Sequence, residues 1–538
     1  MKIKVVGKIS LLTAFGVITL TCSTLAPAET LIVKTADGRV HGKLINDGKV
    51  SAYQGIPYAA PPVGKLRWQA PQPVLGWNST LDATKYGHRC AQNGATPADS
   101  GSEDCLTLNV YAPVRRPHNA KLPVMFWIHG GGYSGGASSE PRHNGDFLPL
   151  KGVVLVTINY RLGVFGFLAL PELASEQRGA SGNYGLMDMV AALNWVKKNI
   201  AAFGGDPNCV TIFGESAGSF AVSTLMAAPS AQSLFHRAIG ESGGALNSGT
   251  LSMDSLAAAS AKNAAWTKEA GANTLDELRA LSTEQILSVT AKKNEFRFRP
   301  VIDGTFLTES VLDTYKSGRQ AKVPLLAGFN RDEDASLAMG MTAQKWNAMA
   351  KQRYPDKADA FLQLYPGSTD EVAKRSAADF GGDQFIAYGT WKWMEIDRQT
   401  GDKNIYRYKF DLGAPPTKSH WASQASHSDD IEYVFGTLDT LPGVVWRPED
   451  YALSEQMMSY WTNFARTGDP NGIDGNGQRL PEWPKYTYGD PVLHLDHPTT
   501  SRPDENRGRY EFWQNDEAHL SHLSPKAASD DAKSCSKP

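Results

Sequence analysis

Short apolar segments alternate with amphipathic segments through the middle of this 538-residue chain. Residues 122–128 and 153–158 have the length and the β-branched content of buried strands. Residues 183–202 then repeat their apolar side chains at helical spacing. Residues 210–213 form a further apolar run, followed by a helical segment of small residues at 217–228. Strands that alternate with helices in this way predict a mostly parallel sheet covered by helices on both faces.

The rest of the chain fits one large α/β domain. The apolar share of 41% and the charged share of 20% exclude a disordered or fibrous protein. Later segments are helical at 250–293 and 340–400, and a strand is expected at 404–410. No repeat and no linker-like composition divides the chain. We therefore expect a single domain over residues 29–538 with insertions, ending in a polar tail from about residue 521.

The first 28 residues predict an export signal. Three lysines precede an apolar stretch at about 9–20, and Ala26-Pro27-Ala28 has the pattern of a cleavage site. The stretch is too short to span a bilayer comfortably, and Thr19 and Thr21 do not suit lipoprotein processing at Cys22. No later segment approaches the roughly 20 apolar residues of a membrane helix. We expect cleavage near Ala28 and a secreted or periplasmic mature chain with no membrane span.

The charge balance gives no indication of a nucleic-acid partner. The formal net charge is −2, and loss of the three lysines in the predicted export signal makes it more negative. The sequence has no long basic stripe, so binding to nucleic acid is not expected.

Five cysteines must be assigned. Cys22 leaves with the predicted signal. Cys90 and Cys105 lie close together in a polar stretch, and an oxidising compartment favours a disulfide between them. Cys209 precedes an apolar strand and is expected to be a buried free thiol, whereas Cys535 stays unassigned in the polar tail.

Gly214-Glu215-Ser216-Ala217-Gly218 joins the strand at 210–213 to the small-residue helix. A serine on such a sharp turn projects its Oγ above the carboxyl end of the sheet, and glycines two residues on either side avoid a collision. The helix start supplies N–H groups and a positive dipole end to developing negative charge. The pattern also occurs in plain turns, but the flanking strand and helix favour Ser216 as a nucleophile of acyl transfer.

His129-Gly130-Gly131-Gly132 follows the strand at 122–128 and offers backbone N–H groups without side chains. Acyl transfer passes through a tetrahedral oxyanion that needs such preorganised donors. The alternative is dinucleotide binding, because Gly130, Gly132 and Gly135 also satisfy G-x-G-x-x-G. That function needs an acidic residue about 20 positions later, and residues 147–171 contain neither Asp nor Glu. The sequence therefore favours an oxyanion loop.

Several motifs resemble those of the type-B carboxylesterases, the group that includes cholinesterases and bacterial p-nitrobenzyl esterases. Residues 203–218, Phe-Gly-Gly-Asp-Pro-Asn-Cys-Val-Thr-Ile-Phe-Gly-Glu-Ser-Ala-Gly, match the family's active-site signature throughout, and residues 102–110 resemble its second signature. The resemblance runs from about residue 31 to Trp513. It implies the α/β-hydrolase fold, a central mostly parallel sheet covered by helices on both faces, with inserted loops and helices around the active site.

The same resemblance implies a catalytic triad of Ser216, Glu333 and His427, in the chain order expected of an α/β-hydrolase. It also implies roles for other residues: oxyanion N–H groups from Gly131, Gly132 and Ala217, polar neighbours of the catalytic centre in Glu215 and Ser242, and an early disulfide, Cys90–Cys105. One departure is Asp334, which stands where the family usually has Gly. This second carboxylate could alter access or local charge.

Sequence physics alone does not select His427 from the 12 histidines. His420 lies seven residues away and is the natural rival. The alternative for Glu333 is a solvated charge among Arg331, Asp332 and Asp334. His129 is expected to hold the oxyanion turn. The histidines expected in loops or on the surface are His41, His88, His118, His494 and His497. No H-E-x-x-H and no paired C-x-x-C occurs, so no metal site is expected.

These residues predict a two-step acyl transfer on a small-molecule ester, without a cofactor. Three alternatives stay open: a non-catalytic, cholinesterase-like binding protein on the same fold, an enzyme acting on an amide, thioester or lactone, and an esterase specialised for a bulky, carboxylate-bearing ester of mycotoxin type. For the last, Arg297 and Arg299 could bind the carboxylates, although two surface arginines are the simpler interpretation. The sequence does not select between a monomer and a dimer.

Overall fold

The computed structural model describes residues 31–94, 101–117, 119–246, 249, 251–292, 296–416, 424–487 and 489–523. From Ile32 on, the chain forms one compact unit. The predicted export signal and Cys22, near one end of the chain, and Cys535, near the other, lie outside the described residues.

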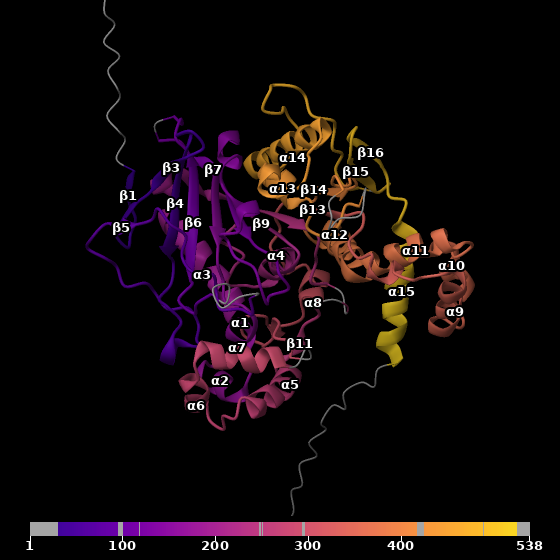
Figure 1. Ribbon diagram of the computed structural model, residues 1–538, viewed down its shortest axis with the longest axis horizontal. Helices are drawn as coiled ribbons and strands as arrows, with labels where there is room; N and C mark the ends of the chain where they lie inside the picture. Colours follow the sequence, from indigo (N-terminus) through magenta and orange to yellow (C-terminus); the bar gives the residue numbers. More distant parts are fainter. Residues whose placement is uncertain are drawn as a thin grey trace, which may run out of the picture. The chain divides into compact units, whose positions relative to one another are not determined.

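An eleven-stranded sheet forms the centre of this unit and runs from β3 on the left of Figure 1 to β16 on the right. The six neighbouring pairs from β15 to β8 are parallel, and the outer pairs are antiparallel. In spatial order the strands are β16 (Thr500–Pro503), β15 (Pro491–Leu495), β14 (Ile405–Phe410), β13 (Leu325–Asn330), β10 (Arg237–Glu241), β9 (Gly205–Glu215), β7 (Leu122–Ile128), β8 (Val154–Ile158), β6 (Thr107–Pro113), β4 (Val50–Pro57) and β3 (Lys43–Ile45). The predicted mostly parallel sheet is confirmed.

Alternate residues of the central strands face two separate hydrophobic cores. On β7, Phe126 and Ile128 belong to one core, and Met125 and Trp127 belong to the other. Helices α3 (Tyr184–Asn199) and α4 (Ala217–Ala227) pack in the first core, and α13 (Ile431–Phe435) and α14 (Pro448–Thr467) pack in the second. Both faces of the sheet are therefore covered by helices, as predicted.

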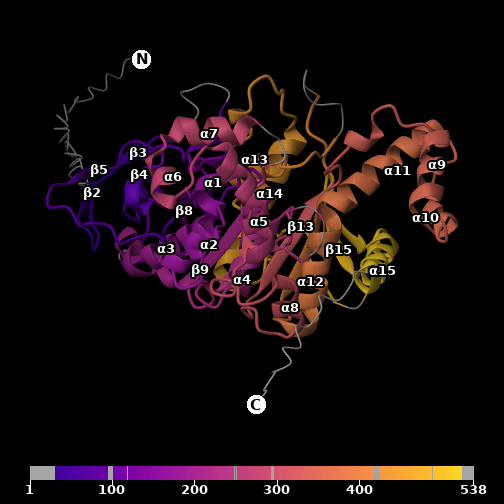
Figure 2. The same cartoon turned by 90° about the horizontal axis from the view of Figure 1, so that it is seen from below.

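Two insertions add helices beyond the sheet. The first contains α5 (Leu256–Glu269), α6 (Leu275–Ala280) and α7 (Thr283–Lys292), which Figure 1 shows near α1 (Gly163–Phe167) and α2 (Pro171–Glu176). The second contains α9 (Ala343–Arg353), α10 (Ala358–Leu364), α11 (Asp370–Gly382), a π-helix (Asp383–Ala387) and α12 (Tyr388–Thr400), which Figure 2 shows beside α15. The remaining elements are β1 (Ile32–Lys34), β2 (Arg39–His41), β5 (Leu81–Asp82), β11 (Asp254–Ser255), β12 (Val301–Ile302), α8 (Val311–Lys316) and α15 (Arg507–Leu523).

Several boundaries differ from those expected. Strand β9 begins at Gly205 rather than at residue 210, but its register against β7 shifts between Leu122 and Val124. Cys209 lies in this irregular part and is half-buried rather than buried, with its Sγ 3.2 Å from Arg237 Nη1. Helix α15 continues to Leu523, slightly past the expected start of the polar tail, and the rest of that tail lies outside the described residues.

No helix in the described ranges combines the length and the apolar character needed to cross a bilayer.

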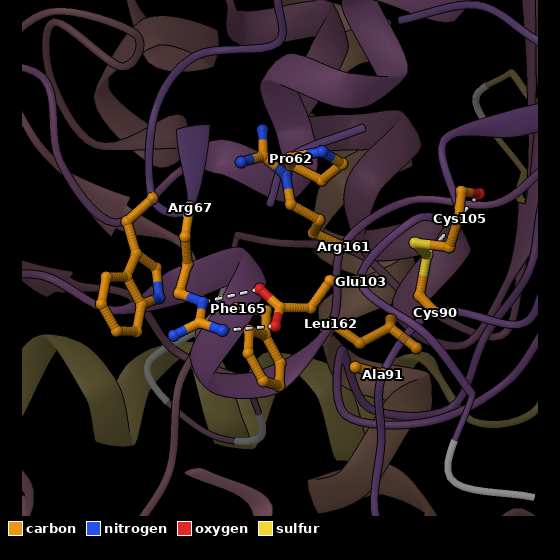
Figure 3. A pocket seen from close by; sticks show the side chains of 10 residues that line it. Pro62, Arg67, Cys90, Ala91, Glu103, Cys105, Arg161, Leu162 and Phe165 are labelled. Atoms are coloured by element: carbon orange, nitrogen blue, oxygen red, sulfur yellow. Dashed lines mark hydrogen bonds and ion pairs between the residues drawn. A yellow bond between two sulfur atoms is a disulfide. The ribbon is translucent and has the colours of Figure 1, made fainter. Parts of the chain in front are cut away.

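A buried ion pair ties the first insertion to the disulfide loop (Figure 3). Cys90 and Cys105 form the expected disulfide. Beside it, Arg67 Nε and Nη2 donate to the two carboxylate oxygens of Glu103 at 2.7 and 2.6 Å, and both side chains are buried. Arg67 Nη1 also donates to the carbonyl oxygen of Leu281 at 2.8 Å, just after α6. The arginine therefore links two distant segments of the chain.

Glu103→Gln should lower the free energy of unfolding by about 3–5 kcal/mol, because it leaves the buried Arg67 charge without its partner. Chemical denaturation followed by tryptophan fluorescence measures this change. The control is Lys198→Gln, which removes an exposed ion pair with Asp37 and should cost about 1 kcal/mol or less. Equal losses in the two variants would contradict the role assigned to Arg67–Glu103.

Candidate active site

Ser216 follows β9 directly and precedes the first residue of α4. Its backbone has φ 53° and ψ −122°, a conformation that residues other than glycine rarely adopt. The turn packs closely on β7: a Cβ on Gly214 would lie 2.6 Å from the carbonyl oxygen of Ile128, and a Cβ on Gly218 would lie 2.0 Å from it. A side chain at either glycine would collide with the backbone of β7, as the sequence predicts for the two positions around Ser216.

His427 lies between Ser216 and Glu333. Its Nε2 is 2.9 Å from Ser216 Oγ, and its Nδ1 is 2.5 Å from Glu333 Oε2. Glu333 comes from the loop after β13, and His427 from the loop before α13. The other carboxylate oxygen of Glu333 accepts hydrogen bonds from Ser242 Oγ at 2.6 Å and from the Asn330 N–H at 2.7 Å. These two donors fix the direction in which Glu333 faces the imidazole.

Asp332 and Asp334, the acidic neighbours of Glu333 in sequence, bond to residues other than His427. Asp332 pairs with Arg375 and Arg331 and accepts from the backbone N–H of Ala425, which joins two loops. Asp334, the departure from the family pattern, accepts from the backbone N–H of Ser336 at 2.8 Å. It therefore stabilises the turn after Glu333.

A second carboxylate lies against His427. Glu215 Oε1 is 3.3 Å from His427 Nε2 and accepts a hydrogen bond from Ser428 Oγ at 2.5 Å. Burial lowers the pKa of His427, but the charges of Glu215 and Glu333 and the hydrogen bond to Glu333 outweigh burial and raise the pKa to about 9. Burial raises the pKa of Glu215 itself. Glu215 thus has a direct electrostatic effect on the imidazole.

The glycine loop after β7 lies next to this cluster. A Cβ on Gly130 would lie 3.1 Å from Ser216 Cβ. Gly131 and Gly132 have φ values of 100° and 62°, and a Cβ on Gly131 would lie 2.2 Å from the Gly135 carbonyl oxygen. Within the described ranges, no acceptor takes a hydrogen bond from the N–H groups of Gly131, Gly132 or Ala217. These three donors can therefore bind an anion.

His129 holds the glycine loop, as expected. Its Nδ1 is 2.8 Å from the Gly130 carbonyl oxygen, and its ring stacks on Tyr160 at 4.5 Å between centroids. Burial lowers its pKa to about 4, so the neutral imidazole uses its Nδ1–H as the donor to Gly130. Tyr160 OH donates to the His129 carbonyl oxygen at 2.8 Å and secures the loop from the other side.

Two expectations about histidines have different outcomes. The sequence predicts His494 in a loop or at the surface, but it lies buried in β15, with Nδ1 2.5 Å from Asp411 Oδ2. The prediction was wrong because a single histidine in a strand carries no sign of its ion-pair partner. The rival His420 and the set-aside His118 lie outside the described residues.

Two other side chains lie close to His427. The Phe385 ring, on the π-helix, meets the imidazole edge-to-face at 4.9 Å between centroids. Asp430 is buried and bonded to Tyr408 OH at 3.0 Å, and burial followed by the charges of Glu215 and Glu333 raises its pKa to about 7. A π-helix has no recognisable residue pattern, so Phe385 could not have been found beforehand.

In the parts of the chain that the structure describes, no group of three His, Cys, Asp or Glu side chains is arranged to hold a metal ion.

Comparison with known proteins gives a match to the carboxylesterase family over residues 29–513. The chain belongs to this carboxylesterase family. It therefore has the α/β-hydrolase fold and is a carboxylic ester hydrolase.

Three curated relatives are 34–37% identical to this carboxylesterase. The fumonisin B1 esterase of Sphingopyxis macrogoltabida is 35% identical over 485 residues, covering 85% of this chain and 84% of the relative. The para-nitrobenzyl esterase of Bacillus subtilis is 37% identical over 482 residues, covering 85% and 92%. The human cocaine esterase is 34% identical over 522 residues, covering 89% and 90%.

Because the imidazole must be neutral to accept a proton, a His427 pKa of about 9 predicts that kcat/KM keeps rising with pH through 7 and 8. Glu215→Gln removes one negative charge that raises this pKa and should therefore move the acid limb to lower pH. The measurement is kcat/KM for a p-nitrophenyl ester between pH 5 and 10. Glu482→Gln, an exposed change in the loop before β15, is the control. An acid limb at the same pH in all three proteins would contradict the effect of Glu215.

Proposed function

We propose that this carboxylesterase hydrolyses small-molecule esters through a Ser216–His427–Glu333 triad and an acyl-enzyme intermediate. The observation that carries the proposal is the pair of contacts made by one imidazole, 2.9 Å to Ser216 Oγ and 2.5 Å to Glu333 Oε2. This is the arrangement of a serine nucleophile, its base and the group that orients the base.

In the proposed reaction, His427 Nε2 takes the proton of Ser216 as Oγ attacks the ester carbonyl carbon. The carbonyl oxygen becomes an oxyanion, which the N–H groups of Gly131, Gly132 and Ala217 stabilise. Glu333 holds Nδ1 and stabilises the imidazolium. His427 then gives its proton to the leaving alcohol, and the acyl group remains on Ser216. Water repeats the sequence and releases the acid. Each step balances without a cofactor.

We also propose that residues 1–28 direct export and are removed, so that the mature single-domain enzyme acts outside the cytoplasm. The Cys90–Cys105 disulfide supports this proposal, because disulfides persist in oxidising compartments. The mature chain would begin near the first described strand.

The family alone does not specify the substrate. Relatives of similar identity are named for fumonisin B1, a para-nitrobenzyl ester and cocaine, which differ widely in size and charge. Substrate preference must therefore come from side chains outside the triad and the oxyanion loop.

Ser216→Ala should lower hydrolysis of p-nitrophenyl acetate, butyrate and octanoate by about 10⁴-fold or more in purified residues 29–538, because the nucleophile is lost. A fluorophosphonate probe should label the parent protein and leave Ser216→Ala unlabelled. Ser175→Ala, an exposed change on α2, is the control and should keep both activities.

The proposal fails if Ser216→Ala keeps the activity of the parent. Absence of both hydrolysis and labelling in the folded parent would favour the alternative of a binding protein on the same fold.

A further inference from the structure

A cavity with a volume of about 310 Å³ lies between the first insertion and the segment that leads into β12. Strands β11 and β12 pair in parallel and bring Asp254 opposite Val301. Helix α5 forms another wall, and Phe167, the last residue of α1, also lines the cavity. The cavity is thus built from three segments that are distant in sequence.

The charged lining of this cavity is mainly basic. Lys262, Arg297 and Arg299 contribute three cations, and Asp254 contributes one carboxylate. That carboxylate is already bonded to Lys262 at 2.6 Å. Within the described part of the chain, neither Arg297 nor Arg299 donates a hydrogen bond or forms an ion pair. Among the described residues, the two arginines thus line a cavity whose single carboxylate already pairs with Lys262.

The two guanidinium groups are close enough to repel each other. Arg299 is half-buried, and burial followed by the charge of Arg297 lowers its pKa, while Asp254 acts in the opposite direction. An anion between the two arginines would relieve this repulsion. The planar fork of a guanidinium matches a carboxylate, which it binds through two parallel N–H···O bonds.

Hydrogen bonds to Asn183 fix the backbone of the segment that carries the two arginines. Asn183, just before α3, accepts from the Val301 N–H at 3.0 Å and donates to the Val301 carbonyl oxygen at 2.9 Å. On the opposite wall, Asn263 of α5 donates to the Ala169 carbonyl oxygen at 3.2 Å. These bonds attach both walls to the core of the domain, so the arginines start from a defined backbone position.

The cavity lies close to the oxyanion loop. The Phe167 ring packs against the Tyr133 ring at 5.1 Å between centroids, and Tyr133 directly follows Gly132. One pair of buried aromatic rings therefore lies between the cavity and the oxyanion loop beside Ser216. The leaving alcohol of a bound ester must face His427, whose neighbour is Phe385. The acyl part of a bound ester extends from the carbonyl carbon on the side opposite the leaving alcohol.

We propose that the cavity at Lys262, Arg297 and Arg299 binds a free carboxylate at the far end of the acyl chain of the substrate. The enzyme would then prefer monoesters of dicarboxylic or polycarboxylic acids over neutral esters of the same length. This inference deepens the proposed function and rests on it, because the bound acyl group must reach Ser216.

The test compares p-nitrophenyl hydrogen suberate with p-nitrophenyl octanoate, which have the same chain length and differ in the terminal carboxylate. In the parent, kcat/KM should be higher for the suberate ester, and added NaCl should reduce this preference. In Arg297→Gln/Arg299→Gln the ratio of suberate to octanoate should fall about 10- to 100-fold, as expected for lost charge-assisted hydrogen bonds. Octanoate hydrolysis should change by less than about twofold, which also shows that the variant is folded.

Lys345→Gln/Lys351→Gln on α9 is the matched control, because it removes two exposed positive charges and should leave the ratio unchanged. Arg297→Lys/Arg299→Lys should restore part of the preference. An unchanged ratio in Arg297→Gln/Arg299→Gln, with octanoate still hydrolysed through Ser216, would overturn the carboxylate site and leave the esterase proposal standing. Loss of octanoate hydrolysis in the parent itself would overturn both.

Discussion

The left-handed backbone of Ser216 is the constraint on which the rest of the site depends. A non-glycine residue with φ 53° costs about 1–3 kcal/mol, and it persists only where its surroundings enforce it. Here the enforcement comes from β7, because Gly214 and Gly218 pack directly on the carbonyl oxygen of Ile128. The Ser216 N–H also donates to the Glu241 carbonyl oxygen on β10 at 2.9 Å. Two neighbouring parallel strands thus hold the turn that presents Ser216 Oγ to His427.

The same parallel arrangement explains why the candidate site gathers at one edge of the sheet. Strands β7, β9 and β13 are parallel, so the loops that follow them emerge at a common edge. These loops carry the glycine turn, Ser216 and Glu333. Glu215 and Glu333 are both buried beside His427, so their charges are poorly solvated and act strongly on the imidazole. Glu215 therefore has two roles: it precedes Ser216 in the turn, and its buried charge raises the pKa of His427.

The two insertions supply side chains around the candidate site and the basic cavity. The π-helix between α11 and α12 brings Phe385 against the imidazole, and the first insertion forms one wall of the basic cavity. The buried Arg67–Glu103 pair links this insertion to the disulfide loop. A single fixed sheet can therefore carry the chemistry while the inserted helices vary the surroundings of the substrate.

Features that depend on neighbours along the chain could be predicted from the sequence. Alternating strands and helices predicted the parallel sheet, and the glycines around Ser216 indicated a turn with close backbone approach. The resemblance to a family proposed Glu333 and His427, which spacing alone could not select. Contacts between segments far apart in the chain could not be predicted and are seen only in the folded structure. His494 pairs with Asp411 across 83 residues, Glu215 lies against His427 across 212, and Arg297 and Arg299 share a cavity with Lys262. Local periodicity reports which side of an element is buried, but it does not report what that side is buried against.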